Sequence, residues 1–260
     1  MKLISSLFIV AMVVGLAAPP ARANEAGDLV NKADMVYRGK SSASVFDMTI
    51  KLSSGERAYK VVVWSENGDK NRVLIKMLGP ALWRGFGTLK VDNSLKVYDP
   101  KSNHVSVVSH SMLGDSWMGS HFSNDDLVKE TRLDRDYTVK LLTKSTRDTG
   151  LGFSATYHTL ELSPTPRAPV VWGRIIYELW THDDTTVPVK VSYFRKADDR
   201  TPTRTITFSK VRKFDGRMVP ATLQVAVTDK PGEFTRIDYE KLKFNVRIGD
   251  QKFTEQALKH

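Results

Sequence analysis

Six histidines and one serine–histidine pair are the side chains of this sequence that could act in hydrolysis. The histidines are His104, His110, His121, His158, His182 and His260, and Ser109 directly precedes His110. A serine nucleophile and its base are assembled in space, so neighbouring positions in the sequence carry no catalytic meaning. The sequence also lacks the GxSxG motif that exposes the nucleophile of many hydrolases. We therefore expect no catalytic residue and a protein that is not an enzyme.

A second group of side chains has the chemistry of a zinc site, because imidazoles and carboxylates are zinc ligands. Its members lie within 17 residues: His110, Asp115, His121, Asp125 and Asp126. Their spacing matches neither HExxH nor the calcium loop of an EF-hand. Ser123 with Asp126 three residues later also fits a helix N-cap with its acidic partner. We expect a helix start here, no metal and no cofactor, and the absence of cysteine excludes disulfides and thiolate sites.

Large apolar side chains gather in the same segment, which reads SHSMLGDSWMGSHFSNDDLVK over residues 109–129. They are Met112, Leu113, Trp117, Met118 and Phe122. Methionine-rich surfaces adapt to ligands of variable shape, such as acyl chains. The alternative is ordinary core packing beneath a loop. We predict that these five side chains bind lipid together with residues of nearby strands, namely Phe46, Met48, Ile50 and Met77.

A third candidate lies in the segment PALWRGFG, where proline and glycines exclude a regular strand interior. Leu82, Trp83 and Arg84 are either packed under a neighbouring element or displayed. An aromatic ring beside an arginine suits a membrane interface or a partner groove. We predict that these three residues touch a membrane or a partner protein.

Strands must position these residues, because apolar and polar residues alternate with a period of two through most of the chain. The candidate segments are 44–52, 59–64, 73–77, 87–91, 95–98, 104–108, 137–142, 153–162, 174–181, 188–194, 203–211, 218–227 and 234–244. Turn signals such as Asp215-Gly216 separate them. From these segments we expect around eleven strands in one antiparallel sheet that curls towards a barrel. The predicted class is mostly β, or α+β by count.

Helical spacing is confined to two places. Residues 25–38 carry Leu29, Val30, Ala33 and Val36 on one face and predict an amphipathic helix that needs a surface. Residues 109–129 predict a loop with one or two short helices lying over the sheet as a lid.

The first 23 residues have the features of a cleaved secretory signal peptide. Lys2 gives a positive start, an apolar run of 12 residues follows from Leu7 to Ala18, and Ala21-Arg22-Ala23 is a small-residue cleavage site. The run is too short for a comfortable membrane span, and no cysteine follows for lipid attachment. We expect a periplasmic protein that is not lipid-anchored, with one domain over residues 24–260.

The formal charge is +10, yet basic residues are mixed with acidic ones, as in Arg132-Leu133-Asp134-Arg135-Asp136. A solubilising surface explains this pattern at least as well as a binding patch does. In a secreted protein the partners of a basic surface are anionic lipid head groups and acidic proteins, so we expect no nucleic acid.

Two strings bring a resemblance to a known family. Residues 75–90 (IKMLGPALWRGFGTLK) and 116–130 (SWMGSHFSNDDLVKE) resemble the outer-membrane lipoprotein-sorting proteins, a LolA-like family. Weaker matches are YRGKSS at 37–42, GRMVP at 216–220 and FTEQAL at 253–258. His121 departs from the family string, where an acidic residue is expected.

The resemblance implies an incomplete antiparallel barrel of about eleven strands, capped by helices, with an apolar cavity for acyl chains. It implies a monomeric carrier of a lipid or lipoprotein that makes transient membrane contact. Its implied partners are an inner-membrane transporter of the RND/MMPL or ABC type and an outer-membrane acceptor. The alternative is an accessory or sensor module that docks on a lipid exporter or a signalling protein without carrying cargo.

Overall fold

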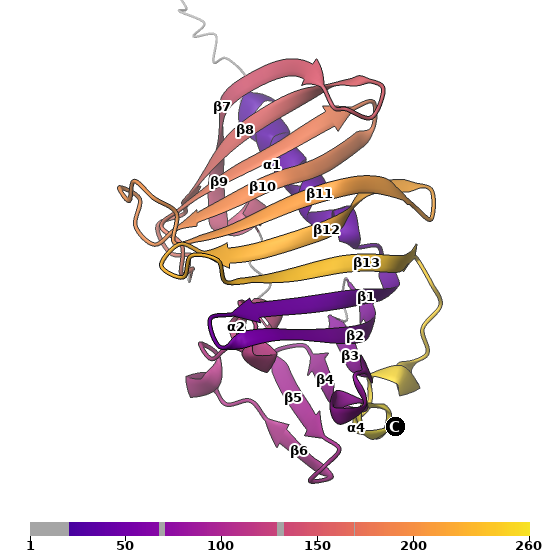
Figure 1. Cartoon of the computed structure of the whole chain (residues 1–260). Helices are drawn as coiled ribbons and strands as arrows, with labels where there is room; N and C mark the ends of the chain where they lie inside the picture. The colour runs from indigo at the N-terminus through magenta and orange to yellow at the C-terminus, as the bar shows by residue number, and fades with distance from the viewer. Residues whose placement is uncertain (1–20, 68–70, 129–132, 169) are drawn as a thin grey trace, which may run out of the picture.

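Every candidate segment of alternating residues forms a strand in the computed structural model, which describes residues 21–67, 71–128, 133–168 and 170–260. The strands are β1 (Ser41–Leu52), β2 (Gly55–Glu66), β3 (Arg72–Gly79), β4 (Gly87–Val91), β5 (Ser94–Asp99), β6 (His104–Val107), β7 (Tyr137–Asp148), β8 (Ser154–Pro164), β9 (Arg174–His182), β10 (Thr185–Phe194), β11 (Arg204–Phe214), β12 (Arg217–Val227) and β13 (Phe234–Phe244). The thirteen strands make one sheet (Figure 1).

The order across the sheet is β6-β5-β4-β3-β2-β1-β13-β12-β11-β10-β9-β8-β7, and all neighbours are antiparallel. β6 and β7 form the two edges and do not pair with each other, so the barrel is incomplete. The predicted fold class is confirmed, while the strand count exceeds the expected eleven by two. The count is higher because all thirteen candidate segments join the sheet.

The two faces of the sheet have different coverings. One face, here called the inner face, carries Phe46, Met48 and Ile50 from β1, and the other, the outer face, carries Leu74 and Leu89 from β3 and β4. Successive side chains of a strand point to opposite faces, and this alternation divides the apolar residues between two cores. Each large side chain that is fully buried this way contributes about 1.5–3 kcal/mol relative to exposure.

The N-terminal helix α1 (Ala21–Asp34) packs across the inner face and is followed by the 3-10 turn η1 (Met35–Tyr37). Ala26, Val30 and Ala33 are buried against Leu160 and Ile175 of β8 and β9. Their spacing of three and four residues places them on one side of the helix, as the sequence predicts. Figure 1 shows α1 running diagonally behind strands β8–β12. Residues 1–20 of the predicted signal peptide lie outside the described residues.

The C-terminal segment covers the outer face of β3 and β4 with η5 (Asp250–Phe253) and α4 (Glu255–Lys259). Leu258 is fully buried against Leu74 and Leu89, and its carbonyl accepts a hydrogen bond from Lys76 Nζ at 2.6 Å. Thr254 caps α4, because its hydroxyl accepts from the backbone N–H of Ala257 at 3.2 Å. The remaining short helices are η2 (Ala81–Trp83), η3 (His110–Met112), η4 (Trp117–Gly119), α2 (Asn124–Val128) and α3 (Leu133–Asp136).

Candidate functional site

The segment from residue 109 to residue 128, here called the lid, lies over the inner face of β1–β4. Trp117 is 5% exposed and its Nε1 donates a hydrogen bond to Thr88 Oγ1 of β4 at 3.2 Å. Met118 and Phe122 are half-buried against the same apolar cluster. The cluster also contains the four strand residues predicted to bind lipid: Phe46, Met48, Ile50 and Met77.

Seven of the nine predicted lipid-binding side chains therefore meet in one cluster. The other two do not belong to it. Met112 is 45% exposed at the end of η3, and Leu113 is half-buried. The alternation of the strands and the composition of the lid indicated that these seven side chains face one apolar layer, and the cluster shows this. Their binding of lipid stays a prediction.

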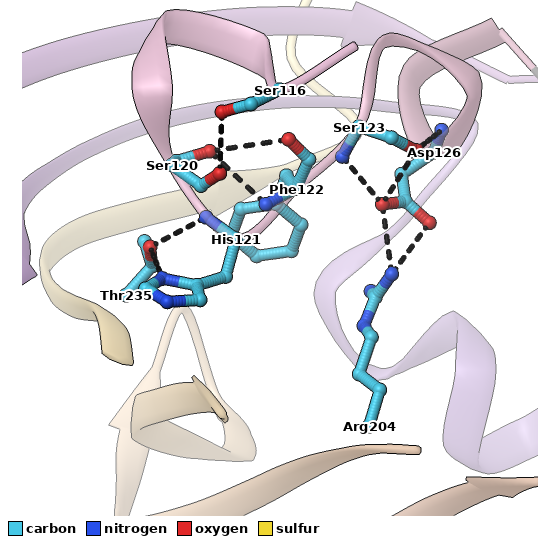
Figure 2. Close-up of polar contacts among 8 residues, drawn as sticks. All are labelled: Ser116, Ser120, His121, Phe122, Ser123, Asp126, Arg204 and Thr235. Atoms are coloured by element: carbon cyan, nitrogen blue, oxygen red, sulfur yellow. Dashed lines mark hydrogen bonds and ion pairs between the residues drawn. The ribbon is translucent and has the colours of Figure 1, made fainter. Parts of the chain in front are cut away.

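A tight loop holds the end of the lid that carries Trp117 (Figure 2). Ser116 Oγ donates to the carbonyl of Ser120 at 2.7 Å, and the Trp117 N–H donates to the carbonyl of Phe122 at 2.8 Å. The loop turns through Met118 and Gly119, whose φ angles are +54° and +67°. A side chain at Gly119 would collide with the Arg57 guanidinium, since the added Cβ would lie 2.7 Å from Nη2. Glycine is favoured at the turn, because its positive φ carries no steric cost and a side chain would displace the Arg57 guanidinium.

His121 fastens this loop to β13. Its backbone N–H donates to Thr235 Oγ1 at 2.9 Å, and its Nδ1 lies 2.8 Å from the same oxygen (Figure 2). The Thr235 hydroxyl already accepts from the backbone, so it is suited to donate to Nδ1 and leave the proton on Nε2. Nε2 is buried and lies 3.8 Å from Glu233 Oε2, beyond hydrogen-bond distance. Burial lowers the pKa of His121, and the neighbouring carboxylate of Glu233 opposes this only in part.

The helix α2 begins at the predicted cap. The Ser123 N–H donates to Asp126 Oδ2 at 2.8 Å, and the Asp126 N–H donates to Ser123 Oγ at 3.2 Å. The same carboxylate accepts two hydrogen bonds from Arg204 Nη1 of β11, at 3.0 Å to Oδ1 and 2.9 Å to Oδ2 (Figure 2). Asp126 thus caps the helix and fixes it to the far side of the inner face.

Arg204 is an unusual partner, because its side chain is only 11% exposed. The guanidinium lies 5.8 Å from the centre of the Phe122 ring and 5.4 Å from that of Tyr193. Its Nε is buried without a hydrogen-bond partner in the described part of the chain. Removal of the single carboxylate partner of a desolvated cation is strongly destabilising, because the buried charge is then left without compensation. The sequence could not reveal this pair, because 78 positions separate its members.

The residues considered for catalysis or metal binding are dispersed. Among the described residues, no three histidine, aspartate or glutamate side chains come close enough to hold a metal ion. His121 and Asp126, two of the five considered for zinc, are bound to Thr235 and Arg204 instead. Ser109 Oγ lies 2.9 Å from Ser111 Oγ, and the His110 side chain lies outside the described part of the structure.

The segment 80–87 presents only part of the predicted docking surface. Leu82 is 64% exposed and Arg84 is also exposed. Trp83 instead packs edge-on against Tyr59, with ring centres 5.6 Å apart, and lies 4.8 Å from Phe86. Packing of the ring follows from η2, which turns Trp83 towards the inner-face cluster. Docking through Leu82 and Arg84 stays a prediction. No helix within the described residues is both long enough and apolar enough to span a bilayer.

A groove of about 950 Å³ lies at the C-terminal end of α1, beside the β9–β10 and β11–β12 hairpins. The sequence did not predict this groove. Its lining comes from five separate parts of the chain, so no local pattern marks it.

Several solved structures have a fold similar to that of this chain. A family model with the description "Uncharacterized protein" matches residues 69–260. The crystal structure of a DUF1329 family protein from Desulfovibrio piger has a TM-score of 0.74 at 24% identity, over 91% of this chain and 98% of that chain. A domain from Vibrio parahaemolyticus assigned to outer membrane lipoprotein sorting has a TM-score of 0.69 at 19% identity, over 92% and 100%.

A LolA superfamily protein from Nitrosomonas europaea has a TM-score of 0.64 at 22% identity, over 89% of this chain and 98% of that chain. A sequence search among curated proteins finds no significant match. At these identities the likeness establishes the fold, and it confirms the predicted LolA-like architecture.

Proposed function

We propose that this chain, which belongs to the family described as "Uncharacterized protein" and has the LolA-like fold, is a non-enzymatic periplasmic carrier of acyl chains. In this proposal the lid opens, the acyl chains of a lipid or lipoprotein enter between lid and sheet, and an envelope partner later receives them. The predicted signal peptide and the lipoprotein-sorting description of one similar structure support the periplasmic setting.

The observation that carries the proposal is the apolar cluster beneath the lid. Met48 and Ile50 are fully buried in the same cluster as Trp117, and Met77 belongs to this cluster as well. Burial of an acyl chain contributes about 0.8 kcal/mol of binding free energy per methylene group. A long chain can therefore offset the cost of opening the lid. The two methionines can repack around chains of different shape, since thioether side chains are flexible.

Release of the acyl chains requires that only a few polar contacts hold the lid to the sheet. The structure has few such contacts. In the described part of the lid, polar contacts to the sheet are those of Arg57 with Gly119, Thr88 with Trp117, His121 with Thr235 and Asp126 with Arg204. A carrier must bind and let go, and a lid fastened at separate points can open without unfolding the sheet.

The test is lipid binding by the protein purified from the periplasm without detergent. Native mass spectrometry should detect bound lipid, and a fluorescent fatty acid should bind the delipidated protein. Trp117→Ala should weaken that binding at least tenfold. The matched control is Val107→Ala, because Val107 is exposed on the edge strand β6. Repeated absence of bound lipid together with no fatty-acid binding would refute the carrier function.

A second candidate is an accessory or sensor module that docks on an inner-membrane transporter, of the RND/MMPL or ABC type, or on a signalling protein. The close packing of Trp117 on Met48 and Ile50 favours it, because a filled core needs no cargo. Leu82 and Arg84 are the exposed residues that would dock. Capture of the same membrane partner by delipidated and lipid-loaded protein would support this module over the carrier.

A further inference from the structure

The groove at the end of α1 exists because β10 and β11 diverge. Only Lys190–Tyr193 of β10 pair with Arg204–Thr207 of β11, although β10 begins at Thr185 and β11 continues to Phe214. β11 then kinks at Lys210, whose φ is +54°. The β9–β10 and β11–β12 hairpins are therefore not hydrogen-bonded to each other, although Trp180 and Val187 still pack with Val211 and Met218. A groove of about 950 Å³ lies beside the two hairpins at the end of α1. This volume falls within the range of small-molecule sites.

Apolar side chains form the walls of the groove. Met35 of η1 is 42% exposed, although it neighbours the buried Val36. Phe153, Trp180 and Met218 belong to one apolar cluster on the outer face and line the opposite side. Phe153 and Met218 are half-buried. An apolar wall that remains open to solvent at this scale is suited to a ligand with an apolar part.

Basic side chains surround these walls. Five basic residues line the groove and all are exposed: Lys32, Arg38, Lys40, Lys213 and Arg217. Among the described residues of the lining, Asp184 is the only acidic one. Within the described residues, the side chains of Lys32, Arg38, Lys40 and Lys213 make no ion pair. Arg217 Nη1 donates to the Arg38 carbonyl at 2.9 Å, which joins two sides of the groove.

We infer that this groove binds an acidic lipid, with the ionised head group among the basic side chains and the first part of the acyl chain against Met35, Phe153 and Met218. This inference rests on the proposed function and specifies its cargo as an anionic amphiphile. Five cations facing one carboxylate attract an anion, and arginine forms paired hydrogen bonds with carboxylate or phosphate oxygens. An anion alone would leave the apolar walls in water, and a neutral lipid would leave the cations unpaired.

The groove and the lid share no lining residue, yet they meet at the end of α1. Val36 lines the groove, and the next residue, Tyr37, stacks on Tyr239 at 4.9 Å between ring centres and packs against the lid-side cluster. The head-group site is therefore separable from the lid by mutation, although Val36 and Tyr37 connect the two sites through the end of α1.

The experiment measures binding of laurate, dodecanol and inorganic phosphate to the delipidated protein by calorimetry. A rim variant combines Lys32→Glu, Lys40→Glu and Lys213→Glu, which are exposed positions without ion pairs. A control variant carries the same charge change at the opposite ends of the strands, at three other exposed positions: Lys140→Glu, Lys196→Glu and Arg200→Glu. Circular dichroism confirms that both variants fold.

The inference predicts that laurate binds the wild type at least tenfold more tightly than dodecanol does, and that phosphate alone does not bind measurably. The rim variant should weaken laurate binding at least tenfold and the control variant less than twofold. Met35→Asp, a change at an exposed position, should also weaken it. Equal laurate binding by the rim variant and the wild type would overturn the inference, and so would phosphate binding as tight as that of laurate.

The lid variant Trp117→Ala separates this inference from the proposed function. If Trp117→Ala weakens laurate binding and the rim variant does not, the head-group site is wrong and the lid carrier stands. If the rim variant weakens binding and Trp117→Ala does not, the groove stands and binding under the lid fails. If no amphiphile binds the wild type, both fail.

Discussion

Asp126 of the lid helix and Arg204 of β11 form an ion pair between the lid and the sheet, with both carboxylate oxygens within 3.0 Å of Nη1. Because Arg204 is nearly buried and stacks near two aromatic rings, the lid position depends on this pair more than on an ordinary surface ion pair.

Asp126→Asn should loosen the lid without unfolding the sheet. The neutral amide keeps the size of the side chain but removes the charge that the nearly buried Arg204 faces, so the closed lid is destabilised. The sheet should stay folded, because the lid can open on its own. Hydrogen exchange of the amides of residues 116–128 should accelerate at least tenfold. Asp198→Asn is the control, because Asp198 is exposed in a distant turn. Unchanged exchange in the lid would show that the pair does not hold it.

Trp117→Ala and Ile50→Ala should differ in what they destabilise. Ile50 is fully buried within a strand, so its truncation should lower the free energy of unfolding by roughly 2–5 kcal/mol. The lid can open locally, so Trp117→Ala should cost less in global unfolding while releasing bound lipid faster. Chemical denaturation and a lipid dissociation assay measure the two effects. A loss of stability as large as that of Ile50→Ala, with unchanged lipid retention, would identify Trp117 as a core residue only.

The contact of His121 should make the lid sensitive to acid. Burial keeps the pKa of His121 below its ordinary value of 6.5, so the folded state binds this proton less readily than the unfolded state. The stability that neutral His121 provides is therefore complete above about pH 6.5 and is lost as the pH falls below it towards the folded pKa. The protection factors of the lid amides, which correct for the pH dependence of intrinsic exchange, should therefore fall between pH 7 and pH 5.

His121→Gln should flatten this pH dependence, since an amide can bind Thr235 and does not titrate. Burial also lowers the pKa of His158, which contributes in the same direction from β8. His158→Gln serves as the comparison: it should reduce the pH dependence of global stability but leave that of lid exchange intact. If the pH dependence of lid exchange is the same in the wild type and in His121→Gln, His121 is not the cause of the acid sensitivity.

Leu82→Ser and Trp83→Ala should separate docking from packing. Leu82 is largely exposed, so its replacement should change stability by no more than about 0.5 kcal/mol and should lower sedimentation with anionic vesicles. Trp83 packs on Tyr59 and Phe86, so its truncation should cost roughly 3 kcal/mol. Vesicle binding that is equal for Leu82→Ser and the wild type would contradict membrane contact at this loop.

Local patterns predicted the elements of this protein well, and for a physical reason. Alternation reports which face of a strand is buried, and a strand such as Phe234–Phe244 shows it without knowledge of its partners. The Ser123–Asp126 cap likewise depends on residues three positions apart. The lid cluster was predicted in part for the same reason, since Trp117 and Met118 lie in an apolar segment that could not be a strand.

Other features depend on distant parts of the chain and leave no local pattern. The Asp126–Arg204 pair joins a helix to a strand far along the sequence, and only the fold brings them together. The groove arises where β10 and β11 separate, which follows from the kink at Lys210 and the packing of α1 rather than from composition. The sequence did not decide whether the Trp83 ring is exposed or packed, because the loop alone does not fix the direction of the ring.

The central seam of the sheet governs the order in which the molecule can assemble. β1 and β13 are neighbours, and Ser41 Oγ donates to the carbonyl of Val246 across 205 positions of the chain. Pairing over such a separation is entropically costly and slow to form. A polypeptide that emerges N-terminus first therefore holds β1 without its second partner until almost the last strand has arrived. Until β13 is complete, the first half of the sheet is an intermediate in which β1 is an edge strand, unpaired on one side.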